Sequence, residues 1–229
     1  MFGCRKFLLY LVELNSSFAP TNNNFLIEER GVFWAKITIK GKTSHAGEPE
    51  KGSNAIVKAS KLIVDLNNKY KKKLKQFNSG VHRSTISIGI IKGGENVNVV
   101  PFKTEILVDR RITHKEKINT AFSHLKKFIN KKEKSLKIEF ITGTTPFRSN
   151  QKNMYLNTLK KSYKKIKKKN PKYLSSIGVS DGRYFADDKV NIINVGPGSG
   201  DEGHKSNEKL INKDILEYYL ILKDFLNKL

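Results

Sequence analysis

The chain has 229 residues and a mass of 26.1 kDa, and 38% of its residues are hydrophobic, which is enough apolar material for one or two packed cores. This composition excludes a wholly disordered protein. Lysine and arginine total 44 against 21 acidic residues, so the formal net charge is +23, and all but seven of the basic residues are lysine. A lysine excess of this kind is typical of an AT-rich genome, although selection for a polyanionic partner would also produce it.

The cysteine count and the lengths of the apolar runs indicate the compartment in which the protein resides. A single cysteine, Cys4, allows no internal disulfide, which favours a reducing environment. No apolar run approaches the roughly 20 residues of a membrane span, and the run at 7–12 is too short for a signal sequence. We therefore expect a soluble, cytoplasmic protein with no membrane partner.

The segment 32–142 alternates between patterns of strand and helix. Apolar residues alternate in four stretches and recur at helical spacing in two others. Strands are predicted at 35–39, 86–90, 106–108 and 136–140, and helices at 54–66 and 118–129. The resulting order, β-α-β-β-α-β, predicts a ferredoxin-like α/β domain with a four-stranded antiparallel sheet and two helices on one face.

The pattern changes from Gly143 onward. A helix is predicted at 155–166, a short strand around 178–183, an apolar strand at 190–195 and a terminal helix at 215–225. Alternating strands and helices indicate part of an α/β layer domain. The lysine runs on the helices are typical of solvated faces.

Several loops carry side chains suited to chemistry. His45 and His204 each follow a predicted strand within a glycine-containing loop, where α/β folds place ligands. Asn98 lies in a loop, and Arg111 and Arg183 could bind carboxylates through bidentate hydrogen bonds. For each of these residues, an ordinary loop or capping role is the alternative. Glu28 and Glu29 form an adjacent carboxylate pair, which we discount because no partner ligand lies nearby in sequence.

Taken together, these segments resemble a known family. The run GVFWAKITIKGKTSHAGEP at 31–49 is followed by further landmarks in order: Gly93-Gly94, Asn98-Val-Val-Pro101, Asp109-x-Arg111, Ser180-Asp-Gly-Arg183, Gly196-Pro-Gly198, His204 and Glu208. Over residues 25–229 the chain resembles the zinc-dependent amidohydrolases and peptidases that include acetylornithine deacetylase, succinyl-diaminopimelate desuccinylase, aminoacylase and glutamate carboxypeptidase.

The resemblance implies a role for each matching residue. His204 matches the last ligand of a two-zinc site, in which cobalt or manganese could replace zinc. His45 matches a lid histidine that reaches the partner subunit's active site and donates to the oxyanion, and Asn98 matches an amide in the same role. Arg111 and Arg183, with Ser180, match residues that bind the substrate. The implied reaction is amide hydrolysis, in which metals acidify a water and fixed donors stabilise the developing charge.

The family's other metal ligands and its general base have no match here. Glu13 lies about where a metal-binding carboxylate precedes the lid, and an ordinary exposed glutamate is the alternative. One or two ligands cannot close a metal site. We therefore expect the isolated chain to be inactive and to be a C-terminal half, from a truncated gene product or from a split gene with a separately encoded N-terminal half.

The expected organisation is an end of the N-terminal catalytic segment at 1–30, a lid or dimerisation domain at 31–142 and the C-terminal part of an α/β catalytic domain at 143–229. The expected function is metal-dependent hydrolysis of an N-acyl amino acid or small peptide by a homodimer, and Ser-Asp-Gly-Arg favours a desuccinylase. A non-catalytic dimerising fragment is the first alternative. A basic nucleic-acid-binding protein is a distant one, because the strands taken as central carry isoleucine and valine in place of stacking aromatics.

Overall fold

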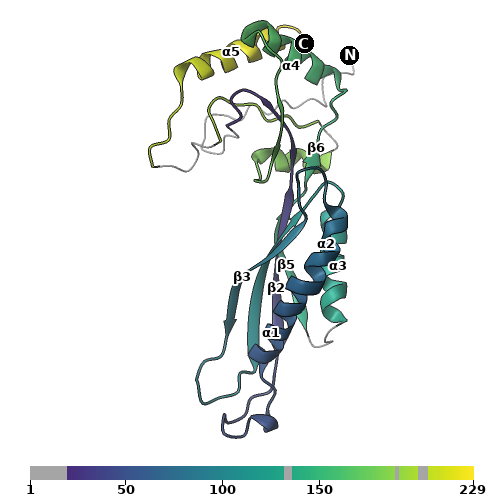
Figure 1. Ribbon diagram of the computed structural model, residues 1–229, viewed down its shortest axis with the longest axis vertical. Helices are drawn as coiled ribbons and strands as arrows, with labels where there is room; N and C mark the ends of the chain where they lie inside the picture. Colours follow the sequence, from purple (N-terminus) through teal and green to yellow (C-terminus); the bar gives the residue numbers. More distant parts are fainter. Residues whose placement is uncertain (1–19, 132–135, 189–190, 201–205) are drawn as a thin grey trace. The chain divides into compact units, whose positions relative to one another are not determined.

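The computed structural model describes residues 20–131, 136–188, 191–200 and 206–229. The chain divides into two compact units, which we call the lid unit (Gly31–Thr145) and the flanking unit (the described residues before and after it). Each unit is built around its own sheet (Figure 1). No helix in the described ranges is long and apolar enough to cross a membrane.

The lid unit is a four-stranded antiparallel sheet in the order β3-β4-β2-β5, with its helices on one face (Figure 1). Its elements are β2 (Gly31–Lys40), α1 (Ala55–Asp65), α2 (Lys71–Leu74), β3 (Thr85–Gly93), β4 (Lys103–Ile112), α3 (Ile118–Asn130) and β5 (Lys137–Thr144). A π-helical turn at Leu66–Tyr70 joins α1 to α2. This arrangement confirms the ferredoxin-like fold predicted from the order of elements.

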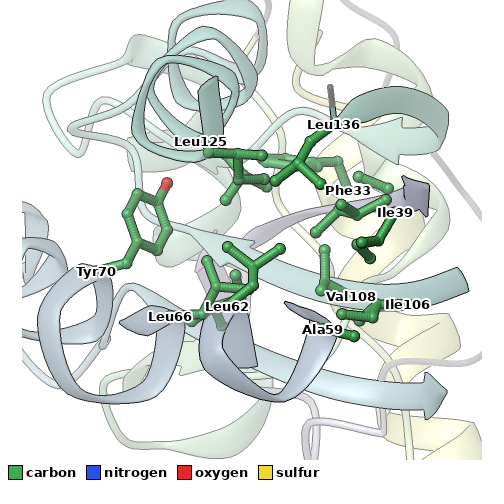
Figure 2. Close-up of a cluster of buried hydrophobic side chains, with 14 of the residues drawn as sticks. Phe33, Ile39, Ala59, Leu62, Leu66, Tyr70, Ile106, Val108, Leu125 and Leu136 are labelled. Carbon is green, nitrogen blue, oxygen red and sulfur yellow. The ribbon is translucent and has the colours of Figure 1, made fainter. Parts of the chain in front are cut away.

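Period-two alternation explains the lid sheet. On β2, Phe33, Ala35 and Ile37 are fully buried, whereas Trp34 between them is half exposed. The buried side chains meet an apolar stripe of α1 and α3, and Figure 2 shows the resulting core. At the start of α1, the Asn54 side chain accepts hydrogen bonds from the backbone N–H groups of Ile56 and Val57, which caps the helix.

One ion pair is buried in the lid unit. The Nη2 atom of Arg110 lies 2.7 and 2.9 Å from the two carboxylate oxygens of Glu116, and Nη1 donates to Ser84 Oγ at 2.7 Å. The side chains of Arg110 and Glu116 are 0% and 2% exposed. A buried charge is tolerated only when it is paired and hydrogen-bonded, so this network depends on all three partners.

The flanking unit contains a three-stranded sheet in the order β6-β1-β7 and two packed helices. Its elements are β1 (Phe25–Glu29), β6 (Phe147–Arg148), α4 (Met154–Lys167), β7 (Tyr173–Ser176) and α5 (Asn212–Leu226), with a 3-10 helix at Asp181–Asp188. Its core joins Phe25 of β1 to Leu159 and Tyr163 of α4 and to Ile221 and Phe225 of α5. Residues from both ends of the described sequence therefore share one core.

Three expectations differ from the structure. The described part of the predicted strand at 190–195 is a loop, and Asn194 forms one isolated bridge with Leu26. The strand predicted around 178–183 lies earlier, as β7, because the Ser180 Oγ and carbonyl accept the N–H groups of Gly182 and Arg183 in a turn. The segment 86–90, taken as central, belongs to the edge strand β3.

Candidate functional site

The loops carrying His45 and Asn98 are joined through their backbones at one end of the lid unit. Ala46 N–H donates to Asn98 O at 2.9 Å, Val100 N–H donates to Ser44 O at 2.9 Å, and His45 and Val99 form an isolated antiparallel bridge. The side chains of His45 and Asn98 are both exposed. The structure therefore brings together the two residues for which the family resemblance implies a shared role.

Gly41 permits a second close approach of backbone segments beside these loops. A Cβ atom on Gly41, at the end of β2, would lie 2.0 Å from Ser53 O and 2.9 Å from Pro101 O. Gly41 N–H donates to Phe102 O at 2.6 Å, and Lys42 pairs with Ser53. Because Gly41 has no Cβ atom, the backbone just after β2 can lie against both neighbouring segments, and a larger residue would not fit there.

The imidazole of His45 is held by its own loop. Gly47 N–H donates to His45 Nδ1 at 3.1 Å, so Nδ1 acts as an acceptor in this arrangement. In a neutral imidazole one nitrogen accepts and the other carries the proton. The hydrogen bond therefore favours the tautomer with its proton on Nε2, where it can be donated to a ligand oxygen.

A hollow of about 500 Å³ lies beside these loops. Ala46 and Ile56 line it together with Gly94, Asn96 and Val99. Its lining combines aliphatic side chains with the amides of Asn54 and Asn96 and the carboxylate of Glu95, so it offers a small ligand both apolar surface and hydrogen-bonding groups.

Arg111 is engaged by a carboxylate on its own strand. Its Nε lies 2.7 Å from Asp109 Oδ1, and its Nη2 lies 3.1 Å from Asp109 Oδ2. Asp109 Oδ2 also accepts from Trp34 Nε1 at 3.0 Å across the β2–β4 pair. A ligand carboxylate at Arg111 would therefore share the guanidinium with Asp109 or displace it.

The turn from Ser180 to Arg183 is anchored to a buried acid. Glu29, at the end of β1, is 3% exposed, and its Oε2 accepts from Ser180 N–H at 2.9 Å. Its Oε1 accepts from Asn194 Nδ2 at 3.0 Å. Burial raises the pKa of the Glu29 carboxyl, while these hydrogen bonds and the charge of Arg183 act in the opposite direction.

Arg183 lies at the end of this turn with part of its side chain exposed. Its Nη2 donates to Tyr184 Oη at 3.0 Å and lies 3.8 Å from Asp181 Oδ1, and its guanidinium carbon is 4.8 Å from the centre of the Tyr184 ring. Its Nε is buried and has no hydrogen-bond partner among the described residues. The guanidinium is thus held on one side by a ring and retains donors for a ligand.

The two predicted metal ligands, Glu13 and His204, lie outside the described residues. Within the residues that the structure describes, no group of three or more histidine, cysteine, aspartate or glutamate side chains is arranged to hold a metal ion. The described donor set therefore does not fit a metal centre by itself.

The remaining histidines of the lid unit have structural contacts. His82 is 1% exposed, His114 Nε2 lies 3.3 Å from Ser79 Oγ, and His124 stacks on Phe77 with ring centres 5.9 Å apart. Sequence reasoning set these three aside. It also discounted Glu29 and passed over Asn194, both of which hold the Ser180–Arg183 turn.

Comparison with known proteins identifies the relatives of this chain. A family model described as a peptidase dimerisation domain matches residues 27–137. A metallohydrolase of Methanocaldococcus jannaschii is 27% identical over 224 residues, covering 89% of this chain and 54% of that protein. The succinyl-diaminopimelate desuccinylase of Aliarcobacter butzleri is 30% identical over 195 residues, covering 82% of this chain and 50% of that protein.

Solved structures agree in fold. The crystal structure of the aminopeptidase PepT from Bacillus cereus aligns with a TM-score of 0.72 at 22% identity, covering 91% of this chain and 54% of that one. The chain spans about half the length of the curated relatives it matches. Residues 27–137 therefore match a peptidase dimerisation domain, and the chain is similar to metallohydrolases, among them succinyl-diaminopimelate desuccinylases.

Proposed function

We propose that this chain supplies the lid and part of the substrate site of a metal-dependent hydrolase that cleaves the amide bond of an N-acyl amino acid or small peptide. The observation that carries the proposal is the backbone pairing of the His45 and Asn98 loops. Relatives named as succinyl-diaminopimelate desuccinylases support the reaction class.

His45 and Asn98 would act on the charge that develops during hydrolysis. The Nε2–H of His45 and the side-chain amide of Asn98 are donors on loops whose backbones are paired, and we assign both to the same oxyanion. Donors that are already oriented stabilise an oxyanion without reorganising during the reaction.

Arg111 and Arg183, with Ser180, would bind the substrate. An arginine can form two parallel hydrogen bonds to a carboxylate, which favours substrates that carry more than one carboxylate. At Arg111 the substrate would share the guanidinium with Asp109 or displace it. The sequence Ser-Asp-Gly-Arg at 180–183 supports a succinylated substrate.

The remaining metal ligands would come from elsewhere. We assign zinc as the metal because the chain resembles zinc-dependent amidohydrolases, in which His204 and Glu13 match metal ligands. Because the curated relatives are about twice as long as the matched region, we assign the other ligands to a polypeptide corresponding to their unmatched half. Mixing this chain with that half should increase deacylase activity above that of either part.

The lid unit would form a homodimer. Its sheet has an edge at β3, whose residues from Ile90 onward are exposed, and α1 carries exposed Ile56, Val57 and Val64. An edge strand and an apolar helix face both favour pairing with a second copy.

Replacing His45 tests the function. In a complete enzyme containing this chain, His45→Ala should lower kcat by about 100-fold or more and leave KM and metal content nearly unchanged, because removal of one oxyanion donor typically costs roughly 2.7–4 kcal/mol. His124→Ala is the matched control and should change kcat by less than about twofold, since His124 stacks on Phe77 and is not part of the paired loops. Loss of metal from His45→Ala would refute the oxyanion role.

A mixed dimer tests whether His45 serves the partner subunit. One subunit carries His45→Ala, and the other carries His204→Ala, which should reduce metal binding. If His45 acts across the dimer, the intact metal site receives a wild-type His45 and about one active site survives. Activity no higher than that of either parent variant would contradict action across the dimer.

A further inference from the structure

The end of β1 carries two adjacent glutamates with different environments. Glu28 is half-buried, and its Oε2 lies 3.7 Å from Arg148 Nε. Glu29 is almost fully buried, and both of its oxygens accept hydrogen bonds, from Ser180 N–H and from Asn194 Nδ2. The two glutamates are therefore a matched pair on one strand, in which Glu29 bonds to the Ser180 turn and Glu28 lies near Arg148.

A continuous hydrogen-bond network leads from Glu29 to the backbone of Arg183. Asn194 Nδ2 also donates to Ser180 Oγ at 2.7 Å, and this oxygen accepts from Gly182 N–H at 3.2 Å. Arg183 N–H donates to Ser180 O at 3.2 Å. The backbone position of Arg183 thus depends on Ser180, which is held directly by Glu29.

The turn has little room to adopt another arrangement. A Cβ atom on Gly182 would lie 2.8 Å from Ile192 Cγ2 and 3.2 Å from both Asn194 Oδ1 and Ser180 Oγ. Gly182 is buried against the same Asn194 that bonds to Glu29. The network and the packing therefore select the same conformation of the turn.

The chemistry of the network requires a carboxyl group. The groups that face Glu29 include a backbone N–H and a side-chain NH₂, both of which are donors. Both oxygens of a carboxyl group can accept, whereas the NH₂ of a glutamine would face one of the donors.

We propose that Glu29 is a positioning residue whose carboxyl group fixes the Ser180–Arg183 turn and so directs the Arg183 guanidinium toward a carboxylate group of the ligand. This inference rests on the proposed function only in assigning ligand binding to Arg183. Glu29 itself is buried beneath the turn and need not touch the ligand.

Hydrogen exchange of the full chain tests the positioning without a ligand. Glu29→Gln should speed exchange of the Ser180 and Arg183 amides by about 10-fold, corresponding to loss of one hydrogen bond, and leave the amides of α4 unchanged. Glu28→Gln makes the same chemical change one residue away and should leave the turn unchanged. Unchanged exchange at Ser180 and Arg183 in Glu29→Gln, or equal acceleration throughout α4, would overturn the proposal.

Succinate binding tests the consequence for Arg183. Calorimetry on the full chain should show that Glu29→Gln weakens succinate binding by about 10-fold, that Glu28→Gln does not, and that Glu29→Gln has no further effect once Arg183→Lys is present. If Glu29→Gln weakens succinate binding equally in the wild type and in Arg183→Lys, Glu29 does not act through Arg183. Absence of succinate binding, or no effect of Arg183→Lys, would refute the assignment of ligand binding to Arg183, and exchange at the turn would still decide whether Glu29 fixes it.

Discussion

The lid unit and the flanking unit differ in how their sequences build a core. The lid unit is one continuous segment whose ends pair with each other, since Val32 lies opposite Thr144. In the flanking unit, Asn22 N–H donates to Gly198 O at 2.7 Å and β1 pairs with β7, so its contacts join distant parts of the chain. All contacts that build the lid unit therefore lie within one segment, whereas the flanking unit depends on pairing between segments far apart in the sequence.

The largest expected effect comes from breaking the buried ion pair of the lid unit. Arg110→Leu should reduce the free energy of unfolding by about 3–5 kcal/mol, because it leaves Glu116 charged and unpaired in the interior. Arg111→Leu is the matched control on the same strand, and its pair with Asp109 is partly exposed, so the expected loss is below about 1 kcal/mol. Urea denaturation measures both, and equal losses would contradict the role of burial.

Cavity substitutions sharpen the comparison between the units. Leu125→Ala in the lid unit and Leu159→Ala in the flanking unit each remove a side chain at most 1% exposed and should each cost about 2–5 kcal/mol. When hydrogen exchange is measured residue by residue, each substitution should speed the exchange of amides in its own unit only. Equal acceleration in both units would show a single cooperative structure and break the comparison.

A smaller effect is expected at the exposed face of α1. Val64→Lys places a charge where the lid unit is proposed to pair with a second copy, and it should weaken dimerisation by about 10-fold, or 1.4 kcal/mol. Val81→Lys is the control, because Val81 is also exposed but lies outside α1 and β3. Sedimentation equilibrium provides the measurement, and equal weakening by both variants would count against this interface.

The last prediction concerns pH and the flanking unit. Because burial raises the pKa of Glu29 above its ordinary value of 4.5, the folded chain holds this proton at a higher pH than the unfolded chain does. The resulting stabilisation is fully present below the unfolded pKa and is lost as pH rises through the folded pKa. The stability of the wild type relative to Glu29→Gln should therefore fall as pH rises from 4.5 toward neutrality. A pH-independent difference in urea denaturation would contradict this expectation.

The sequence predicted the elements of the lid unit more accurately than those of the flanking unit. The elements of the lid unit were predicted because its strands bury one face and its helices bury one stripe, which leaves clear periods of two and 3.6 residues. In the flanking unit, the apolar run around Ile192 and Ile193 predicted a strand. These residues are buried, yet their backbone forms a loop. The prediction was wrong because an apolar run indicates burial but does not show whether a neighbouring strand is available for hydrogen bonding.

Sequence and structure contribute different parts of the candidate site. Motif order predicts His45, Asn98 and Arg183 as site residues, and the structure adds the backbone bonds that join the loops of the first two. The pairing of Asp109 with Arg111 could have been foreseen, because residues two apart share one face of a strand. The role of Glu29 carried no local signal, since its partners lie more than 150 positions away.

The sequence by itself determined the composition of the lid sheet, its order of strands and helices, and the identity of the loop side chains, because these depend on local periodicity and short motifs. Tertiary structure alone decided which carboxylate is buried, which arginine is already paired and which loop presents His45 beside Asn98. The physical reason is that burial and hydrogen-bond partnership depend on groups brought together by folding, and adjacent residues such as Glu28 and Glu29 can therefore acquire different roles.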